Sequence, residues 1–403
     1  MGTSEWLSQS FVRFAQKLAG DVPVRLAGEG PANETRGPAI VIRNPRVLPS
    51  LLLNPEMAFG DGYSEGQIEV EGDLVGLLER IYHVPKRAGT KLIGHWLDWF
   101  QTNTLRGSRR NIHHHYDLSN DFYLLWLDRQ MVYTCAYFPR PDATLEEAQT
   151  AKMDLVCRKV GLRPEESVVE AGCGWGALAL HMARHYGVRV KAFNISHEQI
   201  VFARDRAKRE GLSSRVEFIE DDYRNISGRF DAFVSVGMLE HLGPKNYVEF
   251  GRVIHRTIGD YGRGLLHFIG RNSPRAFSVW MRKRVFPGAY APSLQEAMDV
   301  LEPQDLSVVH LENLRAHYAK TLEHWLARFE QSYQTVVEKF GPRFARMWRL
   351  YLAGSLAAFR VGGLQLFQIV FAGNKCASLP WTWSNLYEAE PLVQEKKWIH
   401  AIS

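Results

Sequence analysis

From about residue 150 the chain alternates between apolar segments of strand length and longer amphipathic segments, and this alternation limits the fold more than any other feature. The segments with strand character are 167–172, 188–196, 216–223, 230–238 and 263–270. The segments with helical spacing are 146–162, 176–187, 197–212 and 246–259. Repeated strand–helix–strand units form a parallel sheet whose two faces are covered by helices. We therefore predict an α/β fold with a Rossmann-like sheet.

The first part of the chain has a different pattern. Three short apolar runs have strand character: 22–28, 39–44 and 67–72. A helical segment follows at 73–82, and Asp73 stands where an N-cap residue would begin it. The whole sequence is therefore predicted to contain three parts: a small α+β N-terminal domain (1–95), a linker (96–115) and a larger domain (116–403).

The charge and cysteine content exclude few partners. Lysine and arginine outnumber aspartate and glutamate by 49 to 44 in 403 residues, a formal net charge of +5. This small excess fits a negatively charged partner, and it fits a protein without one nearly as well. The 4 cysteines form no C-x-x-C pair, so neither a disulfide framework nor a thiolate metal site is expected. The N-terminal residues do not resemble a secretory signal, and we expect a cytoplasmic protein.

The segment 351–373 is nearly as long and apolar as a membrane-spanning helix. Polar side chains at Arg360, Gln365 and Gln368 interrupt it, and two adjacent glycines at 362–363 break it. We predict a buried helix, a turn and a buried strand here.

The sequence EAGCGWG (170–176) lies between the first strand of the larger domain and the following helix. In a doubly wound sheet this turn lies at the carboxyl edge, where ligands bind. Its glycines, Gly172, Gly174 and Gly176, let the backbone approach a ligand closely, and the helix N-terminus favours negative groups. The spacing differs from the G-x-G-x-x-G of dinucleotide sites. It indicates a different small ligand, with a bare tight turn as the other explanation.

The ends of the next two strands place polar residues at the same edge. Asn194 ends the second strand, where an acid commonly binds ribose hydroxyls, and Gln199 lies one helical turn further on. Asp222 and Tyr223 end the third strand, where they could accept from the adenine amino group and stack on its ring. In register with the glycine turn, these residues resemble motif I and its surroundings in class I S-adenosylmethionine-dependent methyltransferases. That resemblance implies that Glu170 faces the methionine amino group.

A longer motif is more specific. The segment HHHYDLSNDFYLLWLDRQMVYTCAYF (113–138) closely resembles the signature of the cyclopropane fatty acid synthases and the related mycolic acid cyclopropane synthases. Other segments resemble this family in the same order: SVGMLEHLGPKNY (235–247), LLHFIG (265–270), VFPGAYAPS (285–293), HYAKTL (317–322) and AFRVGGLQLFQIVF (358–371). The resemblance covers roughly residues 65–371. It implies a mixed seven-stranded methyltransferase sheet and S-adenosylmethionine as the methyl donor.

The resemblance also assigns roles to residues. Cofactor contacts fall on Tyr133, Thr134, Gly172, Gly174, Asn194, Gln199, Asp222 and Tyr223, with Glu170 and Gly176 from the same glycine turn. The family binds a bicarbonate ion, and its ligands fall on Glu240, His267, Tyr318, Ile269 and, through its backbone, Cys135. Thr134 replaces the more usual serine and keeps the hydroxyl group.

These residue types suit the chemistry that the resemblance implies. An isolated alkene is a poor nucleophile, so it needs a methyl donor as strong as a sulfonium, and transfer leaves a carbocation. The methyl protons of that cation are acidic, so a weak base such as bicarbonate suffices if hydrogen-bond donors and an acceptor hold it. Glu240 and His267 end neighbouring strands and would converge there, although an internal Glu240–His267 hydrogen bond is the alternative. Aromatic faces for a cation are available at Tyr137, Phe138, Trp280 and Phe286.

The N-terminal domain narrows the range of substrates that we expect. Its segment AFGDGYSEGQIEVEGDL (58–74) resembles the bacterial cyclopropane-fatty-acyl-phospholipid synthases, whose extra N-terminal domain implies engagement of lipid. We expect the substrate to be the cis-unsaturated acyl chain of a membrane phospholipid, with the enzyme peripherally bound to the inner face of the cell membrane. The basic and aromatic segments RGSRR (106–110) and WMRKRVFPG (280–288) suit an anionic surface. Ordinary solvated charge explains them equally well.

Two other functions stay open. A relative could methylate the same alkene and end with a methylene or methyl branch instead of a ring. A lipid-binding protein without catalysis is the second, and the presence of Glu240 and the glycines argues against it. We expect no nucleic-acid partner, and no metal site, because the adjacent histidines at 113–115 cannot easily share one tetrahedral ion. The sequence is compatible with a homodimer and does not determine the oligomeric state.

Overall fold

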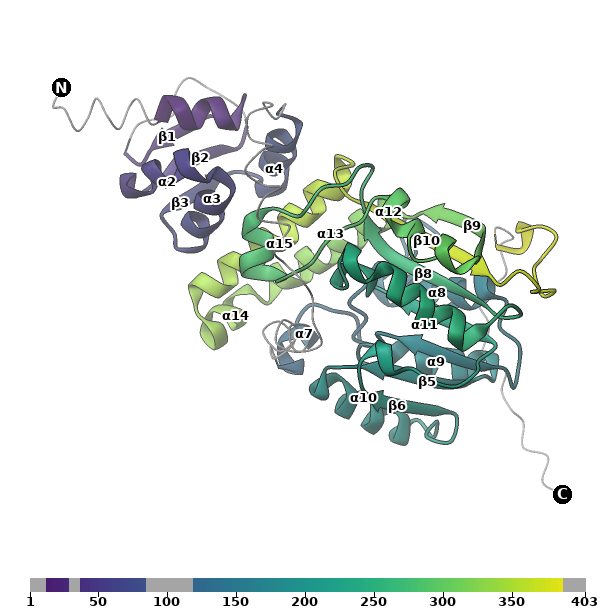
Figure 1. The fold of residues 1–403 in the computed structure, drawn as a ribbon. Coiled ribbons are helices and arrows are strands. Elements are labelled where there is room, and N and C mark those ends of the chain that lie inside the picture. The colour runs from purple at the N-terminus through teal and green to yellow at the C-terminus, as the bar shows by residue number, and fades with distance from the viewer. Residues whose placement is uncertain (1–11, 29–36, 85–118, 387–403) are drawn as a thin grey trace.

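A seven-stranded sheet is the largest feature of the computed structural model, which describes residues 12–28, 37–84 and 119–386 (Figure 1). Its strands are β4 (Ser167–Ala171), β5 (Arg189–Asn194), β6 (Val216–Glu220), β7 (Ala232–Val236), β8 (Arg263–Gly270), β9 (Ser307–Asn313) and β10 (Gln365–Ala372). Their order is β6-β5-β4-β7-β8-β10-β9, and β10 runs antiparallel to both of its neighbours. The remaining neighbours pair in parallel. The predicted mixed seven-stranded sheet is confirmed, although no sequence pattern indicated β9.

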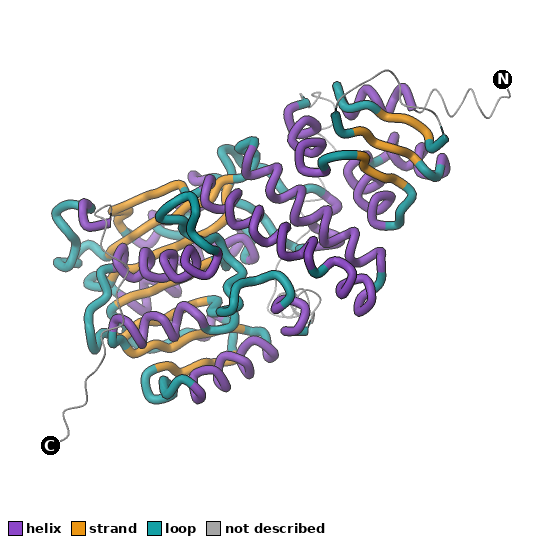
Figure 2. Tube along the Cα trace, turned by 180° about the vertical axis from the view of Figure 1, so that it is seen from behind, coloured by secondary structure: helices purple, strands orange, loops and turns teal. Residues whose placement is uncertain are grey.

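Helices cover both faces of this sheet (Figure 2). One layer contains α8 (Leu145–Val160), α9 (Ala177–Tyr186) and α10 (His197–Arg209), and the other contains α11 (Tyr247–Ile258) and α12 (Leu294–Met298). On β8, Leu265 packs with the first layer, whereas Leu266 and Phe268 pack with the second. His267 therefore points to the α8 side, because strand side chains alternate between the two faces.

Three further helices pack around an aromatic cluster: α13 (Arg315–Gln331), α14 (Tyr333–Phe340) and α15 (Pro342–Arg360). The short helix α7 (Asn120–Leu124) contributes Phe122, whose ring meets that of Trp348 edge to face at a centroid distance of 4.9 Å. Because α15 ends at Arg360 and β10 begins at Gln365, the predicted helix, turn and strand over 351–373 are confirmed. Over the ranges that the structure describes, no helix combines the length and apolar character that crossing a bilayer requires.

The N-terminal region forms its own three-stranded sheet. Its elements are a helical stretch at 12–19, β1 (Val24–Leu26), β2 (Ala39–Ile42), α2 (Leu48–Leu53), α3 (Pro55–Ser64), β3 (Ile68–Glu71) and α4 (Leu74–His83). β2 pairs with β1 in parallel and with β3 antiparallel. The side chain of Asp73 accepts from the Val75 N–H at 2.9 Å, so the predicted N-cap of α4 is confirmed. The helices α2 and α3 were not predicted, because their prolines and glycines resemble turn residues.

One arginine of α15, Arg346, makes several contacts with the N-terminal region. The Arg346 guanidinium donates to the backbone oxygens of Tyr63 and Ile68 at 2.5 Å and 3.1 Å, and it pairs with Glu69 at 3.1 Å. Its carbon Cζ also lies 4.3 Å from the centroid of the Tyr63 ring. The predicted linker at 96–115 lies outside the described residues, so the domain boundaries stay predictions.

A second contact joins α3 to the segment 280–288. A Cβ atom added at Gly60 would lie 2.3 Å from Trp280 Cδ1, so the bare glycine accommodates the indole ring. The Arg284 guanidinium forms two hydrogen bonds with the Asp61 carboxylate, at 2.9 Å and 2.8 Å. Trp280 and Arg284 of this basic and aromatic segment therefore contact α3 of the N-terminal region. No sequence pattern indicated this contact.

Candidate active site

A cavity lies at the carboxyl edge of β4, β5 and β7, where parallel sheets bind ligands. Seven predicted cofactor residues line it: Tyr133, Thr134, Glu170, Gly172, Gly174, Asn194 and Gln199. The lining also includes Lys152, Trp175 and His241, which the sequence analysis did not select. The fold thus brings together the segment before α8, the glycine turn and the end of β5.

The three glycines of the turn have different surroundings. Gly172 and Gly174 have φ angles of 84° and 53°, which L side chains rarely adopt. A Cβ atom at Gly172 would lie 3.1 Å from Met238 Cβ, whereas one at Gly174 would meet no described atom within 4 Å. A Cβ atom at Gly176 would lie 2.5 Å from Phe218 Cζ, and Gly176 lies outside the cavity lining. Gly174 therefore leaves open space for a ligand, while Gly176 serves the packing of the helix on β6.

A buried carboxylate and a buried amine line the cavity together. Glu170 is 2 % exposed and Lys152 is 1 % exposed. Lys152 Nζ donates to Thr134 Oγ1 at 3.0 Å, and Glu170 Oε2 has no hydrogen-bond partner among the described residues. Burial raises the pKa of Glu170 to about 8, although the charge of Lys152 opposes the shift. Such a pair suits a ligand that carries both an ammonium and a carboxylate group.

Two of the four residues predicted around the adenosine line the cavity, and the other two do not. Asn194 Nδ2 donates to Gln199 Oε1 at 2.7 Å, and both side chains line the cavity. Asp222 and Tyr223 lie outside the lining, at the start of η3 (Tyr223–Asn225). The Asp222 carboxylate instead accepts from the backbone and the guanidinium of Arg224, at 3.0 Å and 3.1 Å. Adenine contacts of Asp222 and Tyr223 stay predictions.

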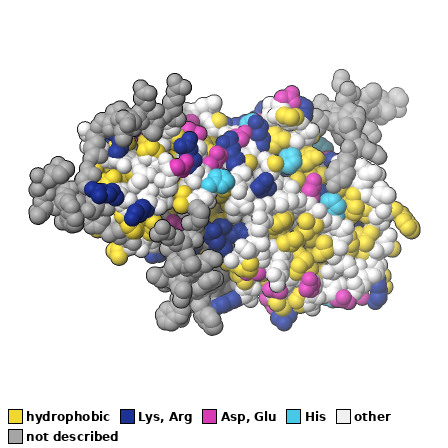
Figure 3. Space-filling view, turned by 90° about the horizontal axis from the view of Figure 1, so that it is seen from above, with side chains coloured by type: hydrophobic (Ala, Val, Ile, Leu, Met, Phe, Trp, Pro, Cys, Tyr) yellow, Lys and Arg dark blue, Asp and Glu magenta, His cyan; other side chains and the backbone are white. Residues whose placement is uncertain are grey.

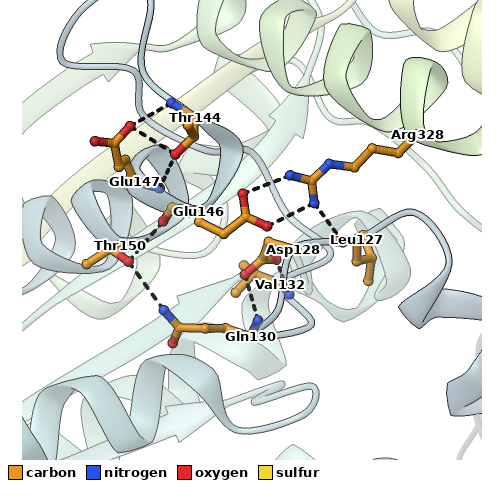
Figure 4. Close-up of polar contacts among 9 residues, drawn as sticks. All are labelled: Leu127, Asp128, Gln130, Val132, Thr144, Glu146, Glu147, Thr150 and Arg328. Carbon is orange, nitrogen blue, oxygen red and sulfur yellow. Dashed lines mark hydrogen bonds and ion pairs between the residues drawn. The ribbon is translucent and has the colours of Figure 1, made fainter.

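The wall that carries Tyr133 and Thr134 is held by buried polar contacts (Figure 4). Asp128 accepts from the backbone N–H groups of Gln130 and Val132 at 2.9 Å and 2.8 Å. Beside it, Arg328 of α13 pairs with both carboxylate oxygens of Glu146 of α8, at 3.0 Å and 2.8 Å. These bonds fix the turn before Tyr133 between two helices, α8 and α13.

Next to the cavity, Glu240 and His267 present buried polar atoms that lack partners. Glu240 lies in η4 (Leu239–His241), which follows β7, and β7 pairs with β8 through Val236 and His267. Glu240 Oε1 accepts from the Ile269 N–H at 3.3 Å, whereas Glu240 Oε2 and His267 Nε2 have no hydrogen-bond partner within the described ranges. Burial raises the pKa of Glu240 to about 7 and lowers the pKa of His267 well below its usual value.

Glu240 and His267, within the described ranges, form no direct hydrogen bond with each other, so the alternative arrangement is not observed. His267 Nδ1 instead contacts Gln368 Nε2 at 2.9 Å. Each side chain therefore keeps one polar atom available for a further group. A buried polar atom without a partner costs stability, so both atoms are candidates to bind a polar group.

The other predicted anion ligands lie on nearby segments. Cys135 is fully buried directly after Thr134, and Tyr318 is 8 % exposed on α13. The backbone N–H of Ala136 donates to Thr321 Oγ1 at 3.0 Å, which ties the Cys135 segment to α13. The Ile269 N–H is engaged by Glu240 in this structure, so it orients the carboxylate directly. Whether these five residues share one anion stays a prediction.

The four candidate aromatic residues have separate positions. The Phe286 ring lies 6.0 Å from that of His241, a cavity residue, and 5.4 Å from that of Tyr351. Tyr137 and Phe138 pack on histidines of α13. Trp280 contacts α3, as described above, so Phe286 has the position best suited to face a cation beside the cavity.

Sequence reasoning overlooked two buried lysines of α8, Lys152 and Lys159. They are seven residues apart and lie on the helix face that also buries Met153, Val156 and Val160. A lysine repeated on the apolar face of an amphipathic helix is the signal that could have identified them. His241 had no separate signal beyond its position next to Glu240.

Among the described residues, no three histidine, cysteine, aspartate or glutamate side chains gather as a metal site would require. The histidines at 113–115 lie outside those ranges. All four cysteines are unpaired, and Cys135, Cys157 and Cys173 are buried.

The sheet order and the cavity at its carboxyl edge define a class I methyltransferase fold, and the cavity fits S-adenosylmethionine. Glu170 offers an unpaired acceptor for the ammonium group, and Gly174 leaves space beside the backbone. A solved coclaurine N-methyltransferase bound to S-adenosylhomocysteine has the same fold, with a TM-score of 0.64 over 79% of this chain and 99% of that chain at 20% identity.

Residues 103–369 match the family described as mycolic acid cyclopropane synthetase, and the chain belongs to this family. It is a S-adenosylmethionine-dependent methyltransferase. The cyclopropane-fatty-acyl-phospholipid synthase of Escherichia coli K12 is 34% identical over 90% of this chain and 94% of its own length. A probable fatty acid methyltransferase of Pseudomonas putida is 36% identical over 86% and 91%. The structure of mycolic acid cyclopropane synthase CmaA1 complexed with SAH and CTAB has a TM-score of 0.62 at 30% identity, over 65% of this chain and 97% of that chain.

Proposed function

We propose that this enzyme transfers a methylene unit from S-adenosylmethionine to the cis double bond of unsaturated acyl chains in membrane phospholipids and closes a cyclopropane ring. The observation that carries the proposal is a pair of buried atoms beside the cofactor cavity, Glu240 Oε2 and His267 Nε2, that have no partner in the part of the chain that the structure describes. A simple methyl transfer to a nucleophile that carries its own lone pair needs no such additional polar site. Ring closure does, because the methylated alkene must lose a proton from the new methyl group.

The substrate class is supported by the extent of the similarity to the Escherichia coli phospholipid synthase. That similarity covers 90% of this chain, so it extends well beyond the 103–369 region that matches the family. By contrast, mycolic acid cyclopropane synthase CmaA1 matches 65% of this chain while 97% of its own length is covered. The additional N-terminal region is thus shared with the phospholipid enzyme, and we infer that it helps to engage phospholipid.

S-adenosylmethionine supplies an electrophilic methyl group when it is bound. The chain's own groups would orient it: Glu170 accepts from its ammonium group, Lys152 and Thr134 donate toward its carboxylate, and Asn194 and Gln199 hold the ribose. Lys152 already donates to Thr134, so the carboxylate would join an existing cationic site. Met238 and His241, at the other edge of the lining, would face the methyl group and the alkene.

Bicarbonate is the group that we propose for the site beside Glu240 and His267. It would supply a weak base held in place, with Glu240 accepting from its hydroxyl group and His267 donating to an oxygen. Tyr318 and the backbone of Cys135 and Ile269 are the other predicted ligands. A carboxylate can fulfil this role only when it is ionised, and burial raises the pKa of Glu240 to about 7, so both forms are accessible near neutral pH.

The acyl chain must leave a bilayer to reach the cavity, so we propose that the enzyme binds the membrane surface peripherally. Figure 3 shows basic, acidic and apolar side chains interspersed over one face of the molecule, without a single large area of one charge. Lys283 is exposed in the segment 280–288, and its neighbour Arg284 is paired with Asp61. Electrostatic attraction would therefore supplement contact with apolar side chains.

Mass spectrometry of host lipids after expression tests the proposed function. Unsaturated phospholipid acyl chains should gain about 14 mass units, the mass of one methylene group, and NMR of the product should show cyclopropane protons. A branched chain with the same mass would favour the alternative C-methyltransferase, in line with the probable fatty acid methyltransferase of Pseudomonas putida. Removing bicarbonate from the buffer should slow the purified enzyme, and adding it back should restore the rate. An unchanged lipid profile with active, cofactor-binding protein would contradict the substrate assignment.

A further inference from the structure

A row of polar side chains crosses three strands of the large sheet and ends at His267. The backbone register pairs Gln368 of β10 with His267 of β8 on one side and with Glu312 of β9 on the other. Lys159 of α8 covers the row, and its Nζ donates to Gln368 Oε1 at 2.6 Å and to the Glu312 carboxylate. We call Glu312, Lys159, Gln368 and His267 the polar row.

The row is buried at one end and reaches the surface at the other. Gln368 and the Lys159 side chain are fully buried, and His267 is 2 % exposed, whereas the Glu312 side chain is 23 % exposed. Buried charged and amide groups are costly unless they are fully hydrogen-bonded. Lys159 Nζ has two described acceptors, and the Gln368 amide is bonded at both its oxygen and its nitrogen, so the row has one preferred arrangement of donors and acceptors.

That arrangement determines where the His267 proton lies. An ammonium group only donates, so the Gln368 oxygen must face Lys159 and the Gln368 amide nitrogen must face His267. An amide nitrogen also donates, so His267 Nδ1 must be the acceptor at 2.9 Å. A neutral imidazole has one N–H group, which is then on Nε2, the atom without a described partner.

We propose that Lys159 and Gln368 are positioning residues that fix His267 as the Nε2–H tautomer, so that it presents a hydrogen-bond donor to an oxyanion beside the cofactor cavity. The role of that donor in catalysis rests on the proposed function, whereas the tautomer follows from the polar row alone. Burial together with the charges of Lys152 and Lys159 keeps the imidazole neutral, which agrees with a single N–H group. An amide cannot pass on a proton without changing its own structure, so the row orients His267 and does not conduct protons to the surface.

The substitution Gln368→Glu tests the proposal with little change of shape. A carboxylate still accepts from Lys159, but it accepts from His267 as well, so Nδ1 should become protonated. The substitution Lys159→Met removes the group that orients the amide, so the two tautomers should become mixed. Gln365→Glu is the matched control, because Gln365 is buried on the same strand and bonds Asn313 and Gly362, not His267.

The measurement is a long-range ¹H–¹⁵N correlation spectrum of protein labelled with ¹⁵N-histidine, with the His267 signals assigned from their loss in His267→Gln. In wild type and in Gln365→Glu, His267 should have a protonated Nε2 and an unprotonated Nδ1. In Gln368→Glu, His267 Nδ1 should be protonated. The kcat of Gln368→Glu should fall by at least about tenfold, as expected when a catalytic histidine loses its orienting partner, while calorimetry gives unchanged affinity for S-adenosylhomocysteine.

A wild-type enzyme with protonated Nδ1, or a folded Gln368→Glu variant with unchanged His267 signals, would overturn the proposal. If Gln368→Glu does not fold, the wild-type spectrum and Lys159→Met still decide it. Failure of the proposed function gives a different result: the expected tautomer would be present, but the wild-type rate would not respond to bicarbonate.

Discussion

The cofactor cavity and the polar row lie against the same helical layer of one sheet, yet they are assembled in opposite ways. Within the larger domain, the cavity residues come from 131–241, chiefly from the segment before α8 and from the turns and helix starts that follow β4, β5 and β7. The polar row joins α8 to β8, β9 and β10, and its hydrogen bonds connect residues up to 209 positions apart. Short motifs at the strand ends therefore mark the cofactor cavity. The polar row exists only because β10 lies antiparallel between β8 and β9.

This difference predicts separable defects. Substitutions in the cavity should remove cofactor binding, and substitutions beside the polar row should remove turnover while the cofactor still binds.

Gly174→Val should abolish binding of S-adenosylhomocysteine. The new side chain would occupy the open space beside the backbone, and the φ of 53° adds strain. Gly211→Val is the matched control, since Gly211 is exposed, has a φ of 68° and would place its Cβ atom within 4 Å of no described atom. Calorimetry should show binding by the control alone. Equal affinity in both variants would remove Gly174 from the cofactor site.

Glu240→Gln should lower turnover by about 10²-fold or more, the scale of a positioned base. The amide keeps the size of the carboxylate but can donate where only acceptance helps. Affinity for S-adenosylhomocysteine should survive, because Glu240 lies outside the cavity lining. Added bicarbonate should stimulate the wild type strongly and the variant little. Normal turnover with a normal bicarbonate response would reduce Glu240 to a structural residue.

Most of the fold was accessible from sequence because periodicity depends on neighbouring residues. The five parallel strands and their helices were predicted, and β10 was recognised through the glycines that separate it from α15. β9 was missed because its exposed and half-buried residues, such as Val308 and His310, lack the apolar run of a central strand. α2 and α3 were missed because proline and glycine there serve helix starts and close packing on Trp280 and Ile68.

Of the candidate site, the sequence predicted the residues that lie in local motifs but not those that depend on long-range pairing. Motif positions such as Glu170, Gly174 and Asn194 line the cavity because the turn and strand ends determine their location. Gln368 appeared in the sequence only as a polar interruption of an apolar segment. Its importance depends on the β8–β10 register, a long-range property that a single sequence does not express.

The amino-acid end of the cofactor offers a finer test of the cavity. Lys152→Met should weaken S-adenosylhomocysteine binding by roughly tenfold or more, because a hydrogen bond to a charged group contributes about 1.5–3 kcal/mol. Binding of 5′-methylthioadenosine, which lacks the amino-acid part, should remain unchanged. Glu170→Gln should show the same pattern through the ammonium group. If Lys152→Met weakens both ligands equally, Lys152 supports the wall of the cavity and does not contact the carboxylate.

Because the pKa of Glu240 is raised, the contribution of its carboxyl group to the free energy of unfolding should depend on pH. Its pKa is about 7 in the folded protein and about 4.3 in an unfolded chain. Folding therefore favours the protonated form, and its stabilising contribution is present below pH 4.3 and lost as the pH rises through 7. Relative to wild type, Glu240→Gln should gain about 1–3 kcal/mol of stability between pH 5 and pH 8. Thermal unfolding at both values measures this change, and a constant difference would mean that the carboxyl group is ionised throughout.

The smallest effect is expected at the surface, where binding to anionic vesicles should weaken as salt rises past physiological strength. Lys283 and Arg284 are both exposed and adjacent, but only Arg284 is paired with Asp61. Lys283→Glu should lower affinity for anionic vesicles by roughly fivefold or more, since it removes a positive charge that contributes about 1 kcal/mol near such a surface and adds a negative charge that the surface repels. The unfolding temperature should stay unchanged. Arg284→Glu places like charges beside Asp61, so it should also lower the unfolding temperature by loosening the contact between α3 and the segment 280–288.

Vesicle sedimentation over a salt series, with neutral vesicles as the control, compares the two variants. Equal binding to neutral vesicles, or binding that ignores both salt and Lys283→Glu, would show that electrostatic attraction does not hold this enzyme on the membrane.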